Sequence, residues 1–200
     1  MIEISSISFS RGTRQIYKEY SAELSVGEAV LLTGPNGSGK STLIQLIGGL
    51  LKPESGYIAI DGAPIAKMSS KVQAKHRAIA PQRRSFTLAF TVAEVLHFLP
   101  SSLRIADNSE LLVRLGLTEL LGKKVTELSI GQQERVSLAL ALGQNANYYL
   151  LDEPFSAQDS QSSLEILKII SELKKEKGVL VISHNQDAIS NYFDRVINLA

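Results

Sequence analysis

The stretch from Gly34 to Ser41 constrains this chain more than any other part of its sequence. It reads Gly-Pro-Asn-Gly-Ser-Gly-Lys-Ser, after the apolar run Val30–Thr33 and before a helical pattern over Ser41–Leu51. Glycines let successive backbone N–H groups turn towards a phosphate chain, and a helix N-terminus adds positive potential there. The stretch therefore predicts a nucleotide-phosphate loop between a strand and a helix.

The side chains of this loop have separate predicted tasks. Lys40 reaches the β- and γ-phosphates and acts in catalysis, while the Ser41 hydroxyl binds Mg²⁺. The nucleotide is therefore expected to be bound by Gly34, Pro35, Asn36, Gly37, Ser38, Gly39, Lys40, Ser41 and Thr42.

Two acidic residues follow a second apolar strand. Tyr148–Leu151 reads as that strand, and Asp152 and Glu153 come directly after it. Ligands of parallel α/β sheets bind at the carboxyl ends of the strands. Asp152 is therefore placed to hold Mg²⁺, and Glu153 is placed to orient or deprotonate the attacking water.

The remaining pattern is that of one α/β domain over residues 1–200. The N-terminal segment reads as strands, and residues from about Thr91 to Asn145 are mainly helical, with Thr91 as an N-cap and Glu94 three residues later. Strand and helix alternate again to the C-terminus. We therefore predict a core with a parallel sheet, interrupted by a helical insertion at approximately residues 83–145. The further expected elements are a strand over Tyr20–Val26, a strand over Tyr57–Ile60, a helix over Asn108–Leu115, a helix over Ser160–Lys175, a strand over Val179–Ser183, a helix over Asp187–Tyr192 and a strand over Val196–Leu199.

Composition excludes several classes of protein. The 200 residues carry a formal net charge of +1, which argues against a nucleic-acid binder that relies on bulk positive charge. No apolar stretch approaches the roughly 20 residues that span a bilayer, and the N-terminus lacks a secretion signal. We therefore expect a cytoplasmic protein, with any connection to the inner face of the membrane made through a partner.

At residues 128–132 the sequence Leu-Ser-Ile-Gly-Gln resembles the signature of the ABC transporter ATP-binding subunits, usually LSGGQ. The phosphate loop and the acidic strand stand in the order of that family, and the resemblance extends over essentially the whole chain. It implies the α/β fold of a P-loop NTPase core with a parallel sheet, an N-terminal antiparallel β subdomain and an inserted helical subdomain. It also implies an ATPase whose cofactors are ATP and Mg²⁺.

Further residues match family motifs. Gln82 resembles the glutamine that senses Mg²⁺ and the γ-phosphate, and His184 resembles the histidine that contacts the γ-phosphate. Asp159, in Ser-Ala-Gln-Asp, resembles the end of the D-loop. The resemblance thus makes Gln82 and His184 catalytic residues, Gln82 also a metal ligand, and Asp159 a nucleotide-site residue.

The signature also points to a dimer. Ser129, Gly131 and Gln132 precede or open an apolar-striped helix, so they form a second anion site on the same chain. Two head-to-tail copies, identical or related, would then hold two ATP molecules between the loop of one chain and the signature of the other. The family further implies an integral membrane permease as partner.

The sequence departs from the family pattern at three places. Ile130 replaces a glycine of the signature, and Gln158 replaces the usual leucine of the D-loop. The aromatic residue expected against adenine is replaced by Arg11. Phe9, Tyr17 or the Arg11 guanidinium itself are the candidates for stacking on the base.

Two other functions fit the sequence less well. A soluble ABC ATPase acting on nucleic acid or the ribosome would usually carry two ATPase halves or long coiled-coil insertions. A small-molecule kinase fits poorly with a signature and a water-activating Glu153.

The segment from Arg83 to Phe90 is predicted to border a groove for a helix of the permease. The transported substrate, and import or export, do not follow from the sequence.

Overall fold

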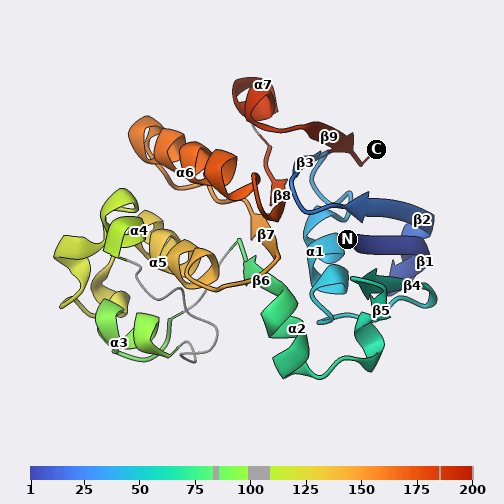
Figure 1. Ribbon diagram of the computed structural model, residues 1–200, viewed down its shortest axis with the longest axis horizontal. Coiled ribbons are helices and arrows are strands. Elements are labelled where there is room, and N and C mark those ends of the chain that lie inside the picture. Colours follow the sequence, from blue (N-terminus) through green and yellow to red (C-terminus); the bar gives the residue numbers. More distant parts are fainter. Residues whose placement is uncertain (83–85, 99–108, 185, 200) are drawn as a thin grey trace.

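The computed structural model of the chain describes residues 1–82, 86–98, 109–184 and 186–199, and within them two sheets form the framework (Figure 1). The antiparallel sheet has the order β2 (Arg14–Leu24), β1 (Ile2–Arg11), β4 (Ser55–Ile60) and β5 (Ala63–Pro64). The parallel sheet has the order β6 (Arg77–Ala80), β7 (Tyr148–Asp152), β8 (Gly178–Ile182), β3 (Ala29–Thr33) and β9 (Arg195–Asn198).

The central parallel strands are buried on both faces. On β7, Tyr148 and Leu150 pack into the core cluster beneath the antiparallel sheet, while Tyr149 and Leu151 face the cluster on the opposite side. This is why the strand reads as a continuous apolar run rather than an alternating one. The predicted α/β class, with its parallel core and N-terminal antiparallel sheet, is confirmed.

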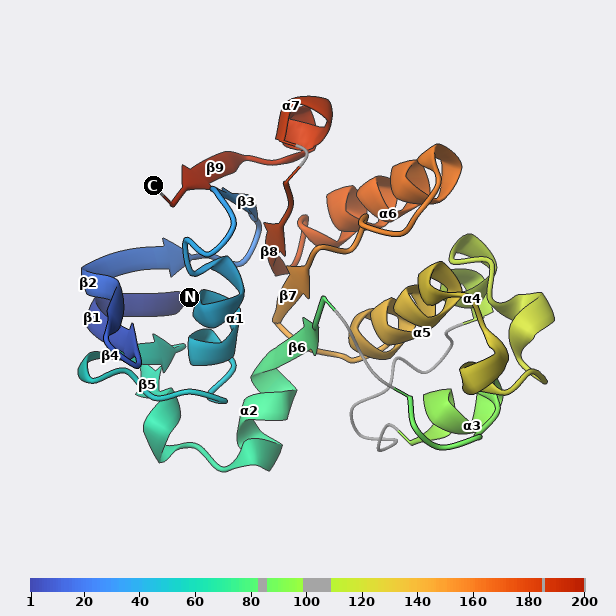
Figure 2. The ribbon, with the colours of Figure 1, turned by 180° about the vertical axis from the view of Figure 1, so that it is seen from behind.

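Helices cover both faces of the parallel sheet. Figures 1 and 2 show α1 between the two sheets, with α5 and α6 on the other side of the parallel sheet. The helices are α1 (Lys40–Ile47), α2 (Ser70–His76), α3 (Val92–His97), α4 (Ser109–Arg114), α5 (Ile130–Leu142), α6 (Ser160–Leu173) and α7 (Gln186–Ile189). In the described part of the chain, none of these helices is long and apolar enough to cross a bilayer.

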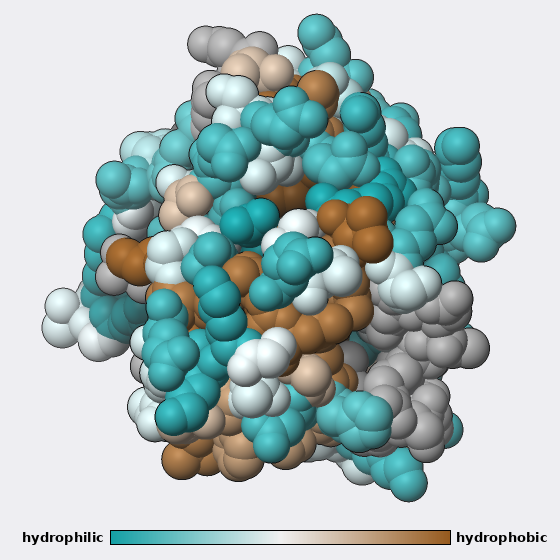
Figure 3. Space-filling model, turned by 90° about the vertical axis from the view of Figure 1, so that its left-hand side faces the viewer, coloured by the Kyte–Doolittle hydropathy of each residue, from teal (hydrophilic) through white to brown (hydrophobic). Residues whose placement is uncertain are grey.

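The helical part of the molecule shows apolar side chains at its surface. Figure 3 looks at the side of α3 to α6 and shows apolar atoms exposed between polar ones. Phe98, at the end of α3, is 61% exposed, and Val113, on α4, is 66% exposed. Leu88, in the segment before α3, is also exposed. Such side chains are available for contact with another protein.

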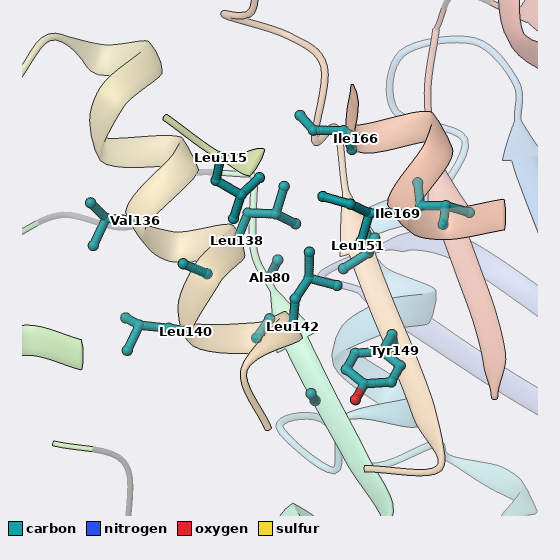
Figure 4. Close-up of a cluster of buried hydrophobic side chains, with 14 of the residues drawn as sticks. Ala80, Leu115, Val136, Leu138, Leu140, Leu142, Tyr149, Leu151, Ile166 and Ile169 are labelled. Carbon is teal, nitrogen blue, oxygen red and sulfur yellow. The ribbon is translucent and has the colours of Figure 1, made fainter. Parts of the chain in front are cut away.

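The larger core cluster joins the helical part to the sheet (Figure 4). Leu138 and Leu142 of α5 meet Ala80 of β6 and Leu151 of β7, and Ile166 of α6 packs beside them. At the surface, Arg114 of α4 forms ion pairs with Glu165 and Glu172 of α6. Hydrophobic packing joins α5 to α6 and the ion pairs join α4 to α6, so the helical part is held against the core of the parallel sheet.

The helices between residues 91 and 142 agree with the predicted insertion. Thr91 and Glu94 form a reciprocal capping box at the start of α3, as the sequence predicts. The helix predicted over 108–115 is observed as Ser109–Arg114, since residue 108 lies outside the described residues. The limits 83–145 for a helical subdomain within one domain of residues 1–200 stay a prediction.

Several boundaries differ from the prediction. α1 ends at Ile47, four residues early, because Gly48 caps it and Gly49 turns the chain with φ +64°. The predicted helix over 187–192 is a short α-helix ending at Ile189, followed by a turn of 3₁₀-helix. Short β6 and α2 were not predicted, since β6 has only four residues and its pairing with β7 is a tertiary contact.

Candidate functional site

A cavity of about 390 Å³ opens where the phosphate loop meets the carboxyl ends of the parallel strands. That volume is within the range of small-ligand pockets, and this edge of a parallel sheet is where such folds bind ligands. The cavity is lined by Arg11, Arg14, Ile16, Asn36, Gly37, Gly39, Lys40, Ser41, Thr42, Gln82, Asp152, Glu153, Ile182 and His184.

The loop over residues 34–39 is held in a conformation that requires glycine. Gly34 has φ +141°, and a Cβ there would lie 2.3 Å from the main-chain oxygen of Leu199. Gly39 adopts φ +107° as the N-cap of α1, and its carbonyl accepts a 2.9 Å hydrogen bond from the hydroxyl of buried Tyr17. The predicted strand, loop and helix are all present, and Gly39 caps α1 without a side-chain hydrogen bond. The first N–H groups of a helix have no partner within the helix, so they can bind an anion.

Lys40 is folded back over this loop. Its Nζ donates to the main-chain oxygens of Gly34 at 2.7 Å and Pro35 at 3.0 Å, and the residue is only 6% exposed. The buried ammonium group is therefore fixed in the cavity by neutral acceptors, and Asp152 and Glu153 lie near enough to interact with it electrostatically. A phosphate group in the cavity would place a further opposite charge directly beside this ammonium group.

Asp152 and Glu153 lie together at the end of β7, both less than 10% exposed. Burial raises the pKa of Asp152, against the opposing effects of the Ser41 hydroxyl, Lys40 and His184. Burial also raises the pKa of Glu153. Glu153 has φ +54°, a left-handed conformation that costs a non-glycine residue about 1–2 kcal/mol. Desolvated carboxylates on strained backbone mark this strand end as a candidate catalytic position.

The donor set beside Asp152 fits a magnesium ion. The Ser41 hydroxyl lies near enough to Asp152 to lower the pKa of that carboxyl against the effect of burial, and the buried Oδ1 of Asp152 has no hydrogen-bond partner in the described residues. Gln82, just after β6, lines the same cavity. Mg²⁺ typically takes one or two protein oxygens with phosphate and water oxygens, and no larger cluster of acidic or histidine side chains is present in the described chain.

Glu153 meets His184 across the neighbouring strand end. Nε2 of His184 lies 3.1 Å from Oε1 of Glu153, and the main-chain N–H of Glu153 donates to the oxygen of Ile182 at 3.0 Å. Oε1 has no well-aligned hydrogen bond within the described residues, so the contact is a close approach of the imidazole to the carboxylate. The His184 side chain is half exposed while Glu153 is buried, so the imidazole borders the open part of the cavity.

The signature residues lie elsewhere, at the N-terminus of α5. The Ser129 hydroxyl accepts from the main-chain N–H of Gln132, and the Gln132 side chain accepts from the N–H of Ser129. Neither residue lines the cavity described above. The structure thus keeps the start of α5 apart from the phosphate loop of its own chain.

Comparison with known proteins identifies the family. Residues 17–156 match the family model described as "ABC transporter". The chain belongs to the ABC transporter family.

Relatives of this ABC protein include transport ATP-binding subunits. The hemin import ATP-binding protein HmuV of Bordetella avium strain 197N is 34% identical over 215 residues, covering 100% of this chain and 82% of that protein. The putative HMP/thiamine import ATP-binding protein YkoD of Bacillus subtilis strain 168 is also 34% identical, over 203 residues; the chain spans 37% of its length and is itself covered completely.

Solved ABC cassettes have the same fold. The dimeric structure of the bacterial ABC transporter cassette MJ0796 superposes with a TM-score of 0.84 at 28% identity, covering 99% of this chain and 94% of that one. A second structure of that cassette, in a post-hydrolysis state, holds ADP and Pi. This ABC chain is an ATP-binding subunit and hydrolyses ATP, and the soluble nucleic-acid or ribosome alternative is not favoured.

The ABC fold brings together most residues that the sequence assigned to phosphate, metal and water. Lys40, Ser41, Gln82, Asp152, Glu153 and His184 all line one cavity. Asp159 does not line it; its carboxylate instead caps α6 through the N–H of Ser162. Their chemical roles in this ABC chain stay predictions.

Of the three residues predicted as candidates for contact with the base, the structure places only one in the cavity. Arg11 lines the cavity, whereas Phe9 does not, and Phe9 packs against the core cluster beneath the antiparallel sheet. Tyr17 is 4% exposed and donates its hydroxyl to Gly39, which leaves no free ring face for a base. The alternative of stacking on Tyr17 is therefore wrong, and the geometry does not support the predicted contact with Phe9.

Arg14 and Ile16 line the same end of the cavity and were not predicted. Arg14 pairs directly with Arg11 across the turn between β1 and β2, where Gly12 adopts φ +63°. The glycine was the available signal, since a two-residue turn at Gly12 would fold the start of β2 back beside Arg11.

Proposed function

We propose that this chain powers import through a separate integral membrane permease, by closing a head-to-tail dimer on two molecules of MgATP. The names of the relatives from Bordetella avium and Bacillus subtilis both specify import. The dimeric cassette structure supports assembly in pairs, with an identical copy or a related ATPase. The permease would bring the chain to the inner face of the membrane.

The observation that carries the proposed chemistry is the approach of Glu153 to His184 beside Lys40. Glu153 is the general base, because its carboxylate is buried at the strand end and faces the cavity that receives the phosphates. His184 contacts the γ-phosphate from the exposed side of that pair. Lys40 stabilises negative charge as the β–γ bond breaks.

Ser41, Asp152 and Gln82 are the residues that would hold Mg²⁺. The unpaired Oδ1 of Asp152 and the Ser41 hydroxyl supply oxygen donors next to the loop. The ion would neutralise charge on the phosphate oxygens. Gln82 lies on the segment between β6 and the helical part, so its contact with the Mg²⁺ and phosphate would couple nucleotide binding to the position of the helical part.

The second anion site is proposed to serve the other subunit. Ser129 caps α5 through Gln132, and Gly131 follows in the first turn, all away from the cavity of the same chain. A symmetric partner would place these groups, together with Asp159, on its neighbour's ATP. Each nucleotide would then be held by two chains.

The permease is proposed to contact the surface before and along α3. Arg83 and Arg84 of the predicted groove lie outside the described residues. Phe86 packs against the larger core cluster, so an acidic residue there would disturb folding as well as docking. Leu88 is 62% exposed and gives a cleaner test. Leu88→Asp should reduce transport in reconstituted vesicles while the ATPase of the isolated subunit is retained; unchanged transport would move the contact elsewhere.

Replacing the base tests the chemistry. Glu153→Gln should lower ATP hydrolysis by roughly 10²–10⁴-fold, the usual value of a general base, while ATP binding survives. Exposed Glu176→Gln is the matched control and should hydrolyse ATP at the parental rate. A Glu153→Gln protein with parental activity would show that another group activates the water.

The same variant tests the shared site. Light scattering should show Glu153→Gln protein as a monomer without nucleotide and as a dimer with MgATP, since bound nucleotide joins the two chains. Adding Ser129→Arg should abolish the dimer while single-chain binding is retained. A dimer that persists in the double variant would contradict the head-to-tail arrangement.

A further inference from the structure

Two arginines on the β1–β2 turn form the end of the cavity beyond the phosphate loop. Arg11 and Arg14 face each other across this turn, and both line the cavity. Nη2 of Arg14 donates to the main-chain oxygen of Gly37 at 3.1 Å, and Nη2 of Arg11 donates to Oε1 of Gln45 at 3.4 Å. Each exposed guanidinium is therefore held near the loop before a ligand arrives, which lowers the entropy cost of binding.

Ile16 completes this end of the cavity. It is partly buried, and its Cγ2 lies 2.6 Å from the position that a Cβ on Gly39 would take. Its apolar side chain thus closes the wall directly beside the start of α1. The end beyond the loop therefore consists of one apolar wall and two cationic planes.

An aromatic platform is missing from this end in the part of the chain that the structure describes. Among the described lining residues the one ring is that of His184, which contacts Glu153 at the catalytic end. Phe9 and Tyr17 belong to the core cluster. A base entering the cavity would therefore meet the guanidinium groups of Arg11 and Arg14 and the side chain of Ile16.

A guanidinium group can bind a base in two ways. Its plane stacks on the π face of any base, an interaction of about 0.5–2 kcal/mol. Its N–H groups are donors only, so they offer nothing to the exocyclic amino group of adenine. They match the O6 and N7 acceptors of guanine, which arginine binds through two hydrogen bonds.

The carbonyl and amide acceptors next to these arginines are already engaged. The oxygen of Gly37 accepts from Arg14, and Oε1 of Gln45 accepts from Arg11. The Asn36 amide, which also lines the cavity, carries both a donor and an acceptor and suits either purine. Among the described residues that line this end, none is arranged to require the adenine amino group or to reject guanine.

We propose that Arg11, Arg14 and Ile16 hold the base, and that this chain binds and hydrolyses ATP and GTP alike. This inference rests on the proposed placement of the triphosphate on residues 34–41. It deepens that proposal, because it assigns the substrate class as purine nucleoside triphosphates and the specificity to an arginine pair.

Titration calorimetry of the intact chain with ATP, GTP and inorganic tripolyphosphate tests the selectivity. The Kd values for MgATP and MgGTP should agree within about fivefold, and the two should be hydrolysed at similar kcat/KM. A site built to read one base rejects others by a factor of about 10⁴. A preference for ATP of more than 100-fold would overturn the inference. Failure to bind even tripolyphosphate would instead refute the phosphate site.

Variants separate stacking from charge. Arg11→Gln and Arg14→Gln should each weaken ATP and GTP about tenfold and leave tripolyphosphate within twofold. Arg14→Lys keeps the charge without the plane, so it should weaken both nucleotides as well. Lys18→Gln removes a charge from an exposed position of β2 outside the cavity and is the control, with unchanged Kd values. Equal losses of tripolyphosphate and ATP, or no loss in either Gln variant, would refute the assignment to the base.

Discussion

Gln158 donates its side-chain amide to the main-chain oxygen of Gly131, at 3.1 Å, and so connects the loop after β7 to the start of α5. The same amide nitrogen lies 3.4 Å from Oε2 of Glu134, whose other oxygen accepts from the Ser156 hydroxyl at 3.3 Å. These hydrogen bonds therefore hold the segment after Glu153 against the first turn of α5. A leucine, which the family usually has at position 158, could not make these bonds.

Gln158→Leu should weaken this connection. The loss of one hydrogen bond costs about 1 kcal/mol, and it would loosen the start of α5 against the loop. We expect ATPase activity to fall about three- to tenfold and its cooperativity in ATP to decrease, with nucleotide binding by the monomer unchanged. The Hill coefficient and kcat from steady-state assays measure this. Exposed Gln161→Leu, in the first turn of α6, should change neither.

Gly131→Ala should be more damaging. A Cβ at this position would lie 2.4 Å from the main-chain oxygen of Ala157, so the loop or the helix must shift. Overpacking of this kind costs about 1–3 kcal/mol. Thermal melts should show a lower Tm and ATP-driven dimer formation should be lost. Gly122→Ala is the control, because a Cβ there meets nothing within 4 Å; an equal effect in both variants would point to backbone entropy alone.

Asp194 gives a pH-dependent contribution to stability. Hydrogen bonding to the N–H of Ala29, with Lys174 as the second partner at 2.8 Å, lowers its pKa. A carboxyl whose folded pKa is lowered stabilises the fold above its ordinary pKa, and this stability is lost as the pH falls through the folded value. Asp194→Asn should therefore cost about 1 kcal/mol at pH 7 and progressively less below about pH 4.

Denaturation with urea at several pH values measures that difference. Exposed Glu119→Gln, in the same experiments, should match the parent protein throughout. A cost for Asp194→Asn that stays constant down to about pH 2 would mean that lost packing, rather than charge, is responsible.

Tyr17 is expected to support the phosphate loop from below. Its hydroxyl is buried and donates to the Gly39 oxygen at 2.9 Å, so Tyr17→Phe removes one of the two donors to this oxygen and leaves the N–H of Leu43 as the other. The free energy of unfolding should fall by about 1 kcal/mol and ATP should bind a few times more weakly. Tyr57→Phe removes an exposed hydrogen bond to Glu3 and should cost less than about 0.5 kcal/mol. Equal unfolding energies for the two variants would contradict the role of Tyr17.

The phosphate loop, the acidic strand end and the fold class could all be derived from sequence because each depends on local pattern. A glycine-rich turn between an apolar strand and a helix specifies its own geometry, as Gly34 and Gly39 show. Strand β7 is covered on both faces, so its sequence is a continuous apolar run that can be recognised locally.

Residues distant in sequence needed the tertiary structure. Phe9 lies between two serines and Tyr17 lies between Ile16 and Lys18, so the local pattern does not assign their rings, and only packing reveals that both are used in the core. Arg14 gained its place in the cavity through the β1–β2 turn, for which Gly12 is a local signal, and through the proximity of Gly37, which the local pattern does not encode. Local sequence determined which residues form the glycine-rich loop proposed to bind phosphate, whereas side-chain packing between distant segments decided which side chains line the other end of the cavity.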